Sequence, residues 1–415
     1  MRPGSLEWAM NANYAAGGGA GNPTKAPPAA GQIADGYQPD AAVSPQIWNY
    51  ARWAMMLMLA GCRSERVLNW QAGSVAGIGG LIGGLGHGIY DPIADVHIWH
   101  GHTGVAANEE ATSDGLIWTG GAPWVVAGNA LYCYAAHDGN GTRAQVTGNL
   151  VPPGANQIGF STGFAAWAAW TAGEPNGQFT LIEHDHVGLW VMTDIGGVGG
   201  ASGDLLVSTG PANAWGAPTS APGFAAGPTV LAHSHHPAAL IYPNDPGNPM
   251  WIAMTPAQKS MSADGQTWSA AAAHGIGGTP LGLAYSAHGT RWIATVACGG
   301  KGWITYSDDN GSTWNPSAVL GNAACPITSS IVNPTEMQIA CDGYGDWMIA
   351  IADSAGGSLE LHASWDNGKT WARVPLPSTP YNAFADLWYG GGRFMLMTTD
   401  GAGNFAAYTS LRADE

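Results

Sequence analysis

Short apolar runs separated by polar turns recur along most of the chain. Three successive units show the pattern most clearly, with runs at 281–285, 291–295 and 303–306, then 337–341, 347–351 and 359–363, then 386–389, 393–397 and 405–409. Apolar and β-branched runs of about four to eight residues between turns are typical of strands. The pattern therefore predicts an all-β chain built from repeated units of three or more strands.

A turn with recurring chemistry follows the first two of these units and the unit that precedes them. The Ser, Asp, Gly and Trp positions of the three clearest turns are Ser262, Asp264, Gly265 and Trp268, then Ser307, Asp309, Gly311 and Trp314, then Ser364, Asp366, Gly368 and Trp371. The carboxylate can accept hydrogen bonds from N–H groups of its own turn, and Gly supplies the positive φ that a tight hairpin needs. A further turn keeps Asp114 and Trp118.

These turns resemble the Asp-box (BNR) repeat. The resemblance implies a propeller of four-stranded blades in which the Asp residues stabilise turns and carry no chemistry. The closing Trp residues lie at 70, 118, 167, 215, 268, 314 and 371, so successive units are 46 to 57 residues apart. About 40 to 50 residues make one blade. We therefore predict a seven-bladed β-propeller, with six blades as the alternative if the Gly-rich stretch 73–99 is not a blade.

The last unit has only three predicted strands. The segment Arg66–Trp70 is placed to supply the fourth strand, next to Phe405–Thr409. Such a pairing would join the two ends of the propeller in one blade and remove an exposed sheet edge. We therefore place the propeller at residues 62–415, closed by a strand near 66–70.

Composition excludes several classes of partner. The 415 residues include 62 Gly and 20 Trp, only 10% are charged, and the net charge is −16 with 13 Lys and Arg. Binding to nucleic acid or to anionic membranes needs clustered cations, so we expect neither. Five cysteines without CxxC spacing favour folding in a reducing compartment. We expect no cofactor and no metal.

The N-terminal region differs in kind from the repeats. Residues 1–43 are rich in Ala, Gly, Pro and Asn, so we expect an extended arm without a core of its own and without a secretory signal. Ser44 and Pro45 then suit the N-cap and first turn of a short α-helix, which Gly61 ends. This helix is too short to span a bilayer. Its apolar stretch begins at Trp53 and would pack on the propeller or on another subunit.

A second resemblance involves the same region. Tyr37 and Pro39, followed by Pro45 and Trp48, are similar to a motif in the N-terminal module of tailed-bacteriophage virion proteins. The resemblance implies that residues 44–61 belong to an attachment module, with Trp53 as a further contact. It also implies a tail or fibre protein that is made in the host cytoplasm and contacts other virion proteins and copies of itself.

Histidines form three clusters that could bind a ligand. Two of them, 184–186 and 97–102, contain imidazoles beside carboxylates or Trp, and the third is His233, His235 and His236. The predicted topology places 184–186 on the rim of the Asp turns and the other two clusters on the opposite rim, which argues against a joint metal site. Longer connections on the opposite rim suit recognition. We therefore name Trp215, His233, His235 and His236 as binding candidates, which could instead pack against a neighbouring copy.

The function predicted from these observations is non-enzymatic. A sialidase would need three Arg on a carboxylate and a Tyr/Glu pair, whereas Arg291 and Arg393 occupy equivalent positions that suggest a structural role. We expect a structural protein of a phage virion whose propeller can contact a host glycan or receptor. The alternatives are a secreted or surface glycan-binding propeller or sialidase-like glycosidase, and an intracellular scaffold.

Overall fold

The computed structural model describes the repeat region of the chain. The chain divides into residues 1–67 and residues 68–415, and only the second unit contains described residues. These are 70–73, 86–102, 106–120, 124–125, 130–149, 158–170 except 164 and 166, 179–194, 205–234, 251–298 except 277 and 288–289, 301–315, 331, 334–353 except 344, 358–376, 383–399 and 405–410.

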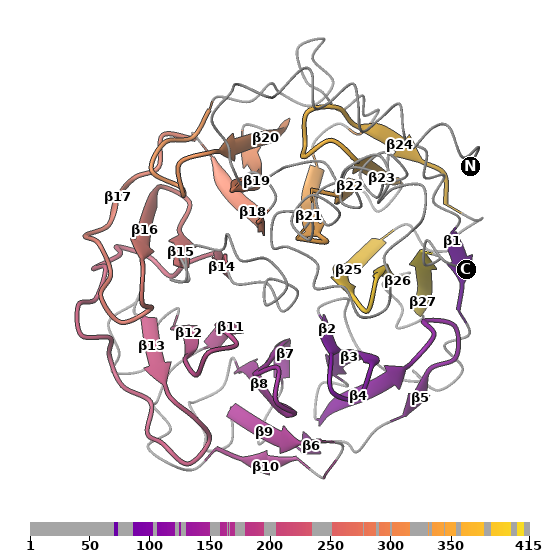
Figure 1. Ribbon diagram of the computed structural model, residues 1–415, viewed down its shortest axis with the longest axis horizontal. Coiled ribbons are helices and arrows are strands. Elements are labelled where there is room, and N and C mark those ends of the chain that lie inside the picture. Colours follow the sequence, from indigo (N-terminus) through magenta and orange to yellow (C-terminus); the bar gives the residue numbers. More distant parts are fainter. Residues whose placement is uncertain are drawn as a thin grey trace, which may run out of the picture. The chain divides into compact units, whose positions relative to one another are not determined.

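The described strands form seven antiparallel sheets arranged around one axis (Figure 1). The innermost, first strands of the sheets are β2 (His87–Asp91), β7 (Ala130–His137), β11 (Phe179–His184), β14 (Val230–His233), β18 (Thr279–Ser286), β21 (Pro334–Cys341) and β25 (Ala383–Gly390). The second strands are β3 (Val96–His102), β8 (Thr142–Asn149), β12 (Trp190–Asp194), β15 (Trp251–Met254), β19 (Arg291–Cys298), β22 (Trp347–Asp353) and β26 (Arg393–Thr399). The fold is a seven-bladed β-propeller, as the sequence predicted.

The outer strands are shorter and less regular. The third strands are β4 (Ala106–Thr112), β9 (Ile158–Thr162), β13 (Leu205–Ser208), β16 (Gln258–Ser262), β20 (Lys301–Ser307), β23 (Leu359–Ser364) and β27 (Phe405–Ser410). The fourth strands are β1 (Trp70–Ala72), β5 (Thr119–Gly120), β10 (Ala168–Ala169), β17 (Ala272–Ala273) and β24 (Ala372–Val374), and β6 (Trp124–Val125) also pairs with β4. The blades of β13 and β20 have a single β-bridge in place of a described fourth strand, from Val207 to Gly216 and from Tyr306 to Asn315.

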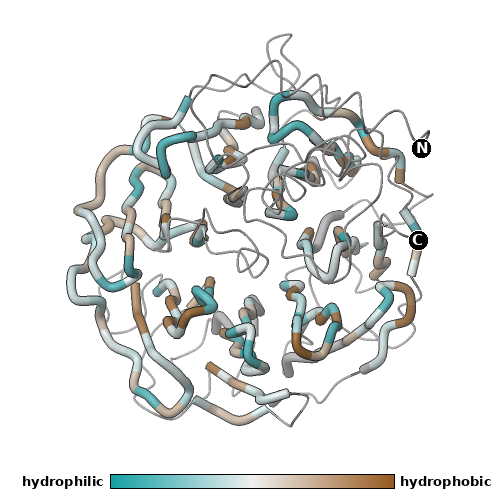
Figure 2. Tube along the Cα trace, in the orientation of Figure 1, coloured by the Kyte–Doolittle hydropathy of each residue, from teal (hydrophilic) through white to brown (hydrophobic). Residues whose placement is uncertain are grey.

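The core lies between neighbouring blades. All residues of β12, β15 and β26 are buried, because a second strand is covered on both faces by adjacent sheets. Trp190, Trp251, Trp292 and Trp347 begin or nearly begin second strands and are at most 2% exposed. Apolar positions consequently recur all the way around the ring of sheets (Figure 2). Each large ring buried here removes apolar surface from water at about 25 cal/mol per Å².

The propeller is closed by a strand from the beginning of the repeat region. β1 pairs antiparallel with β27, with Trp70 opposite Ser410 and Ala72 opposite Tyr408. The predicted segment shares only Trp70 with this strand, and residues 66–69 lie outside the described ranges. The prediction placed the Trp at the end of the strand, whereas Trp118 and Trp371 each stand directly before a fourth strand. Trp70 likewise begins its strand, because its ring packs on the core beside Phe394 and Tyr408.

The Asp turns follow the third strands β4, β16, β20 and β23, and we use this name for residues 112–118, 262–268, 307–314 and 364–371. In each, the Asp carboxylate accepts backbone hydrogen bonds, such as those from the N–H groups of Gln266 and Thr267 to Asp264 at 2.8 and 2.6 Å. Trp268 closes its turn by donating from Nε1 to the carbonyl of Gly265 at 2.8 Å. The predicted turn chemistry is therefore present in the structure.

Several predictions fall outside the described residues. They are the arm at 1–43, the helix at 44–61, the attachment residues Tyr37, Pro39, Pro45, Trp48 and Trp53, and the candidates His235 and His236. Within the described ranges, no helix has the length and apolar character needed to span a membrane.

Candidate functional site

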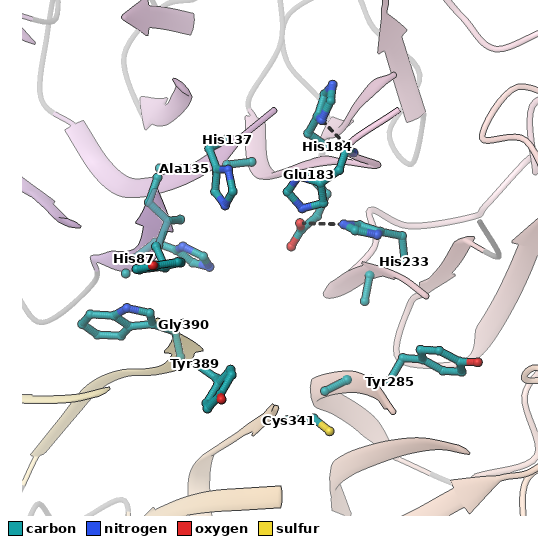
Figure 3. Close-up of a pocket in the computed structure, with 18 of the residues that line it drawn as sticks. His87, Ala135, His137, Glu183, His184, His233, Tyr285, Cys341, Tyr389 and Gly390 are labelled. Atoms are coloured by element: carbon teal, nitrogen blue, oxygen red, sulfur yellow. Dashed lines mark hydrogen bonds and ion pairs between the residues drawn. The ribbon is translucent and has the colours of Figure 1, made fainter. Parts of the chain in front are cut away.

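A cavity of about 530 Å³ opens at the centre of the propeller (Figure 3). It is lined by the ends of the first strands and by the turns that follow them. First and third strands run in the same direction in each antiparallel blade, so the Asp turns lie on this same rim. A second chamber of about 240 Å³ continues between the middle parts of the first strands and shares His87, Glu183 and Trp388 with the outer cavity.

The cavity wall is built from one repeated position. Each first strand contributes one residue, which we call the mouth ring, and the set is Tyr90, His137, His184, His233, Tyr285, Cys341 and Tyr389. In most blades this residue pairs in register with an aromatic residue near the start of the second strand, as His184 does with Trp190 and Tyr389 with Phe394. The ring centroids of these two pairs are 4.4 and 4.8 Å apart. Packing on a buried aromatic therefore fixes the mouth-ring side chains around the axis.

An Asp follows the mouth ring in four blades and stabilises the turn. The Asp185 carboxylate accepts the N–H groups of Val187 and Gly188, both at 2.8 Å. Asp91, Asp138 and Asp342 accept backbone N–H groups of their own turns in the same way. These carboxylates hold the loops in shape, which leaves the side chain just before each of them to face the cavity.

Glu183 breaks the repeat at the neighbouring position. The residue before the mouth ring is uncharged in the other six blades, namely Ile89, Ala136, Ala232, Ala284, Ala340 and Trp388. In the blade of β11 it is Glu183, whose side chain is 32% exposed and faces both chambers. Its Oε2 lies 3.8 Å from Nε2 of His233. Figure 3 marks this pair with a dashed line. This separation is too long for a hydrogen bond.

Burial determines the pKa values in the cavity and in the second chamber, which together form the axial channel. Burial raises the pKa of Glu183 to about 8 and that of Asp386, which lies in the inner chamber, to about 7. Asp386 accepts N–H groups from Gly88 at 2.6 Å and Leu387 at 2.8 Å, which partly offset its burial. Burial also lowers the pKa of His87 to about 3 and that of His137 to about 4. At neutral pH these two imidazoles are uncharged, and the two carboxyl groups titrate close to neutrality.

Three imidazoles form a line beside Glu183. The ring centroid of His186 lies 4.8 Å from that of His137 and 5.6 Å from that of His233. His186 has a φ of 57°, and its backbone N–H donates to Nδ1 of His184 at 2.8 Å. Among the described residues, no group of three or more His, Cys, Asp or Glu side chains could hold a metal ion.

The structure corrects the predicted position of His233. The sequence pattern placed this residue ahead of a first strand and on the rim opposite the Asp turns. Instead, His233 ends the first strand β14 and lies on the same rim as His184 and His186. The cause is the 17-residue separation between β14 and β15, at 234–250, which displaced the expected first strand along the sequence. The structure therefore brings His233 together with His184 and His186, which the predicted topology placed on the other rim.

Trp215 is buried, contrary to its predicted role in binding. Its side chain is only 6% exposed, and its ring centroid lies 4.9 Å from that of Trp170. A Trp that closes an outer turn packs into its own blade, so it is not presented to a ligand. His97 lies at the rim of the cavity, where it pairs with Tyr90, and His100 is buried beside Gln145.

The mouth ring as a whole was missed by the sequence analysis, although the signal was present. His184, Cys341 and Tyr389 each precede the leading aromatic of a second strand by five or six residues. Aligning these blades on that aromatic brings their mouth-ring residues together and makes Glu183 stand out just before them, whereas the 18 residues from His233 to Trp251 hide the blade of β14. The resulting constellation joins aromatic rings, imidazoles and the carboxyl group of Glu183, which suits recognition of a polar group with an apolar body.

Comparison with known proteins supports the fold but assigns the chain to no family. Neither a protein-family model nor a curated protein matches the sequence. The solved structure of YCF48 bound to D1 peptide is 16% identical, with a TM-score of 0.55 over 82% of this chain and 96% of the other. YCF48 from Cyanidioschyzon merolae is 15% identical, with a TM-score of 0.52 over 83% and 99%. Virginiamycin B lyase from Staphylococcus aureus is 10% identical, with a TM-score of 0.55 over 83% and 100%.

Proposed function

We propose that this chain is a non-enzymatic structural protein of a tailed-phage virion whose propeller binds a partner at the axial cavity. The observation that carries the binding role is the mouth ring, in which seven equivalent positions converge on one cavity and carry His, Tyr or Cys. The virion assignment is supported by the N-terminal sequence, where Tyr37, Pro39, Pro45 and Trp48 resemble an attachment module.

The side chains that a sialidase-like enzyme would use have other roles in the described blades. Arg291 forms a bidentate ion pair with Asp308 at 2.7 and 2.8 Å, and Arg393 donates to the carbonyl of Asp114 at 2.6 Å. Arg143 donates to the carbonyl of Gly163, and Arg373 lies 3.4 Å from Glu360. These contacts favour a binding propeller over an enzyme that gathers arginines around a substrate carboxylate.

The partner is either a polypeptide segment or a glycan. Because YCF48 was solved with a D1 peptide, a propeller of this fold is able to hold a polypeptide segment. A glycan is the alternative, which the tyrosines of the mouth ring favour because sugar rings pack on aromatic faces. A glycan ligand would also suit a host receptor, or a secreted glycan-binding protein.

One deletion and one double substitution separate the attachment role from the binding role. Removing residues 1–60 should leave a folded propeller that no longer joins the particle. Replacing Tyr90 and Tyr389 with Ala should leave incorporation normal and reduce adsorption to host cells at least tenfold. Normal incorporation of the truncated chain contradicts attachment through this end, and normal adsorption of a folded double variant contradicts the cavity. Melting temperatures of both proteins serve as the folding control.

A further inference from the structure

The described wall of the axial cavity contains carboxyl groups and histidines but no permanently charged cation. Neither chamber is lined by a lysine or an arginine among the described residues. Asp386 already accepts two backbone N–H groups, so its charge is partly compensated. Glu183 instead has the imidazole of His233 as an ionisable neighbour, with Oε2 and Nε2 3.8 Å apart. A carboxylate held in this way is stabilised by a cation brought by a ligand.

The wall around Glu183 also suits a cation. Tyr90, Tyr389 and Trp388 line the same cavity, and the negative faces of aromatic rings attract ammonium and guanidinium groups. The titratable groups around the Glu183 carboxylate are His87, Tyr134, His137, His184, His186, His233 and Asp386. The lowered pKa values of His87 and His137 keep these two rings neutral at pH 7, so they add no repulsion to an incoming cation.

The rim around the cavity points to a polypeptide as the carrier of this cation. The large hydrophobic side chains that are exposed in the described residues include Ile93 at 67% and Val187 at 70%. Both lie in turns that follow first strands, and each comes directly after a residue that lines the cavity, Pro92 or His186. The same rim carries the Asp turns, whose hydrogen bonds lower the pKa values of Asp264 and Asp366 and keep these carboxylates ionised at pH 7. A rim that carries both exposed apolar side chains and ionised carboxylates complements a basic segment with apolar flanks.

We propose that the axial cavity binds a lysine or arginine side chain of a partner protein, with Glu183 as its counter-ion and the apolar rim contacting the flanking residues. This inference rests on the proposed role of the cavity in recognition and does not depend on the virion assignment. The occupant of the cavity is therefore a basic polypeptide segment. A neutral glycan is the competing outcome of the test.

Binding of the cation is coupled to loss of a proton. Below pH 8 the Glu183 carboxyl is largely protonated in the free protein, because burial raises its pKa to about 8. A bound ammonium group favours the carboxylate, so the proton leaves to solvent on binding. The affinity should therefore rise up to about tenfold per pH unit below pH 8 and level off above it.

The test is calorimetric titration of the full chain with the peptide acetyl-Leu-Lys-Leu-amide. We expect saturable binding at pH 8.5, weaker binding at pH 6.5, and release of close to one proton at pH 6.5 when buffers of different ionisation enthalpy are compared. The same peptide acetylated at the lysine Nζ should bind at least tenfold more weakly. Glu183→Gln should lose at least tenfold in affinity and lose the proton release, while Glu336→Gln, which alters a carboxyl outside the cavity wall, should bind as the parent does.

Three results would overturn the proposal. They are absence of saturable binding at pH 8.5, equal binding of the acetylated peptide, and unchanged affinity in a folded Glu183→Gln variant. Saturable binding of a neutral oligosaccharide that does not depend on Glu183 would overturn the cationic ligand and leave the recognition role of the cavity standing. Loss of adsorption in the mouth-ring variant reports on the recognition role separately, so the two failures are distinguishable.

Discussion

The stability of each Asp turn depends on a single carboxylate. Asp309 accepts the backbone N–H of Thr313 at 2.8 Å and the hydroxyls of Ser307 and Thr313 at 2.7 and 2.5 Å. The hydrogen bonds from Thr313 and Ser307 lower the pKa of Asp309 to about 2. Its stabilising effect is therefore complete above the ordinary pKa near 3.8 and is lost as the pH falls toward 2.

Replacing this carboxylate should destabilise the propeller without affecting binding. We expect Asp309→Ala to lower the free energy of unfolding by about 1–3 kcal/mol, because the turn donors lose their acceptor. Asp309→Asn should cost less, since its amide oxygen still accepts from Thr313. Urea denaturation at pH 7 measures both. An Ala variant with the parent's midpoint would show that the carboxylate does not stabilise the fold.

The roles of the Asp-turn residues could be predicted from the sequence, because these roles follow from the chemistry of the residue type. The role of a mouth-ring residue could not, because it follows from the position of that residue in the blade. Ser, Asp and Gly at fixed offsets specify the hydrogen bonds of a turn locally, so Asp264, Asp309 and Asp366 were assigned correctly. The mouth ring has no common residue type, because what it shares is a place in the blade. His, Tyr and Cys satisfy that place equally well, which hides it from a motif search.

At the scale of the element, each Asp turn also packs on the preceding blade. A side chain on Gly311, which has a φ of 79°, would bring its Cβ within 2.4 Å of Cδ1 of Ile252 in β15. A Cβ on Gly368 would likewise lie 2.5 Å from Cδ1 of Ile293 in β19. The glycine therefore serves both the backbone conformation and the contact between neighbouring blades.

The two contributions of this glycine can be separated. Gly163 lies in the equivalent turn of another blade with a φ of 61°, but a Cβ there would meet no atom within 4 Å. We expect Gly163→Ala to cost about 1 kcal/mol from the strained backbone alone, and Gly311→Ala to cost about 1–3 kcal/mol more through overpacking. Thermal unfolding measures both, and equal losses would show that the contact with Ile252 contributes nothing.

The arginines at the start of second strands connect blades as well. Arg291 donates from Nη1 to the carbonyl of Asn367 at 2.8 Å, and Arg393 from Nη1 to that of Asp114 at 2.6 Å. Each contact joins a second strand to the Asp turn of the next blade, which is the structural role that their equivalent positions predicted. The same periodicity failed at β14, because a long separation before β15 interrupts the spacing on which the prediction relied.

For the whole molecule, closure of the ring depends on a short strand far from its partners in sequence. β1 covers the edge of β27, and the ring of Trp70 is 8% exposed within the core of that blade. We expect a chain that begins at Leu68 to melt within a few degrees of the full chain. A chain that begins at Ser74 should melt markedly lower or aggregate, because it lacks this strand and leaves a sheet edge open. Equal melting temperatures for the two shortened chains would show that closure by β1 contributes no stability.

The axial channel makes the stability of the whole propeller depend on pH. The pKa values of Glu183 and Asp386, about 8 and about 7 in the folded state, lie above their ordinary values, so the folded state binds protons more tightly than the unfolded state. This stabilisation is complete below the ordinary pKa of a carboxyl and is lost as the pH rises through 7 and 8. The lowered pKa values of His87 and His137 act in the opposite direction, but only below about pH 6.5.

Between pH 6.5 and 8.5 the carboxyl groups of the channel should therefore dominate. We expect the free energy of unfolding to fall with rising pH in this window, by at most about 1.4 kcal/mol per pH unit for each titrating group. Glu183→Gln should flatten the fall, because its amide does not titrate, while Asp309→Asn should leave the slope unchanged, because Asp309 is fully ionised throughout the window. Urea midpoints at several pH values measure the three slopes. A parent protein whose stability is constant from pH 6.5 to 8.5 would show that Glu183 is not held in an environment that disfavours its charge, and would remove the physical basis for a cation as its counter-ion.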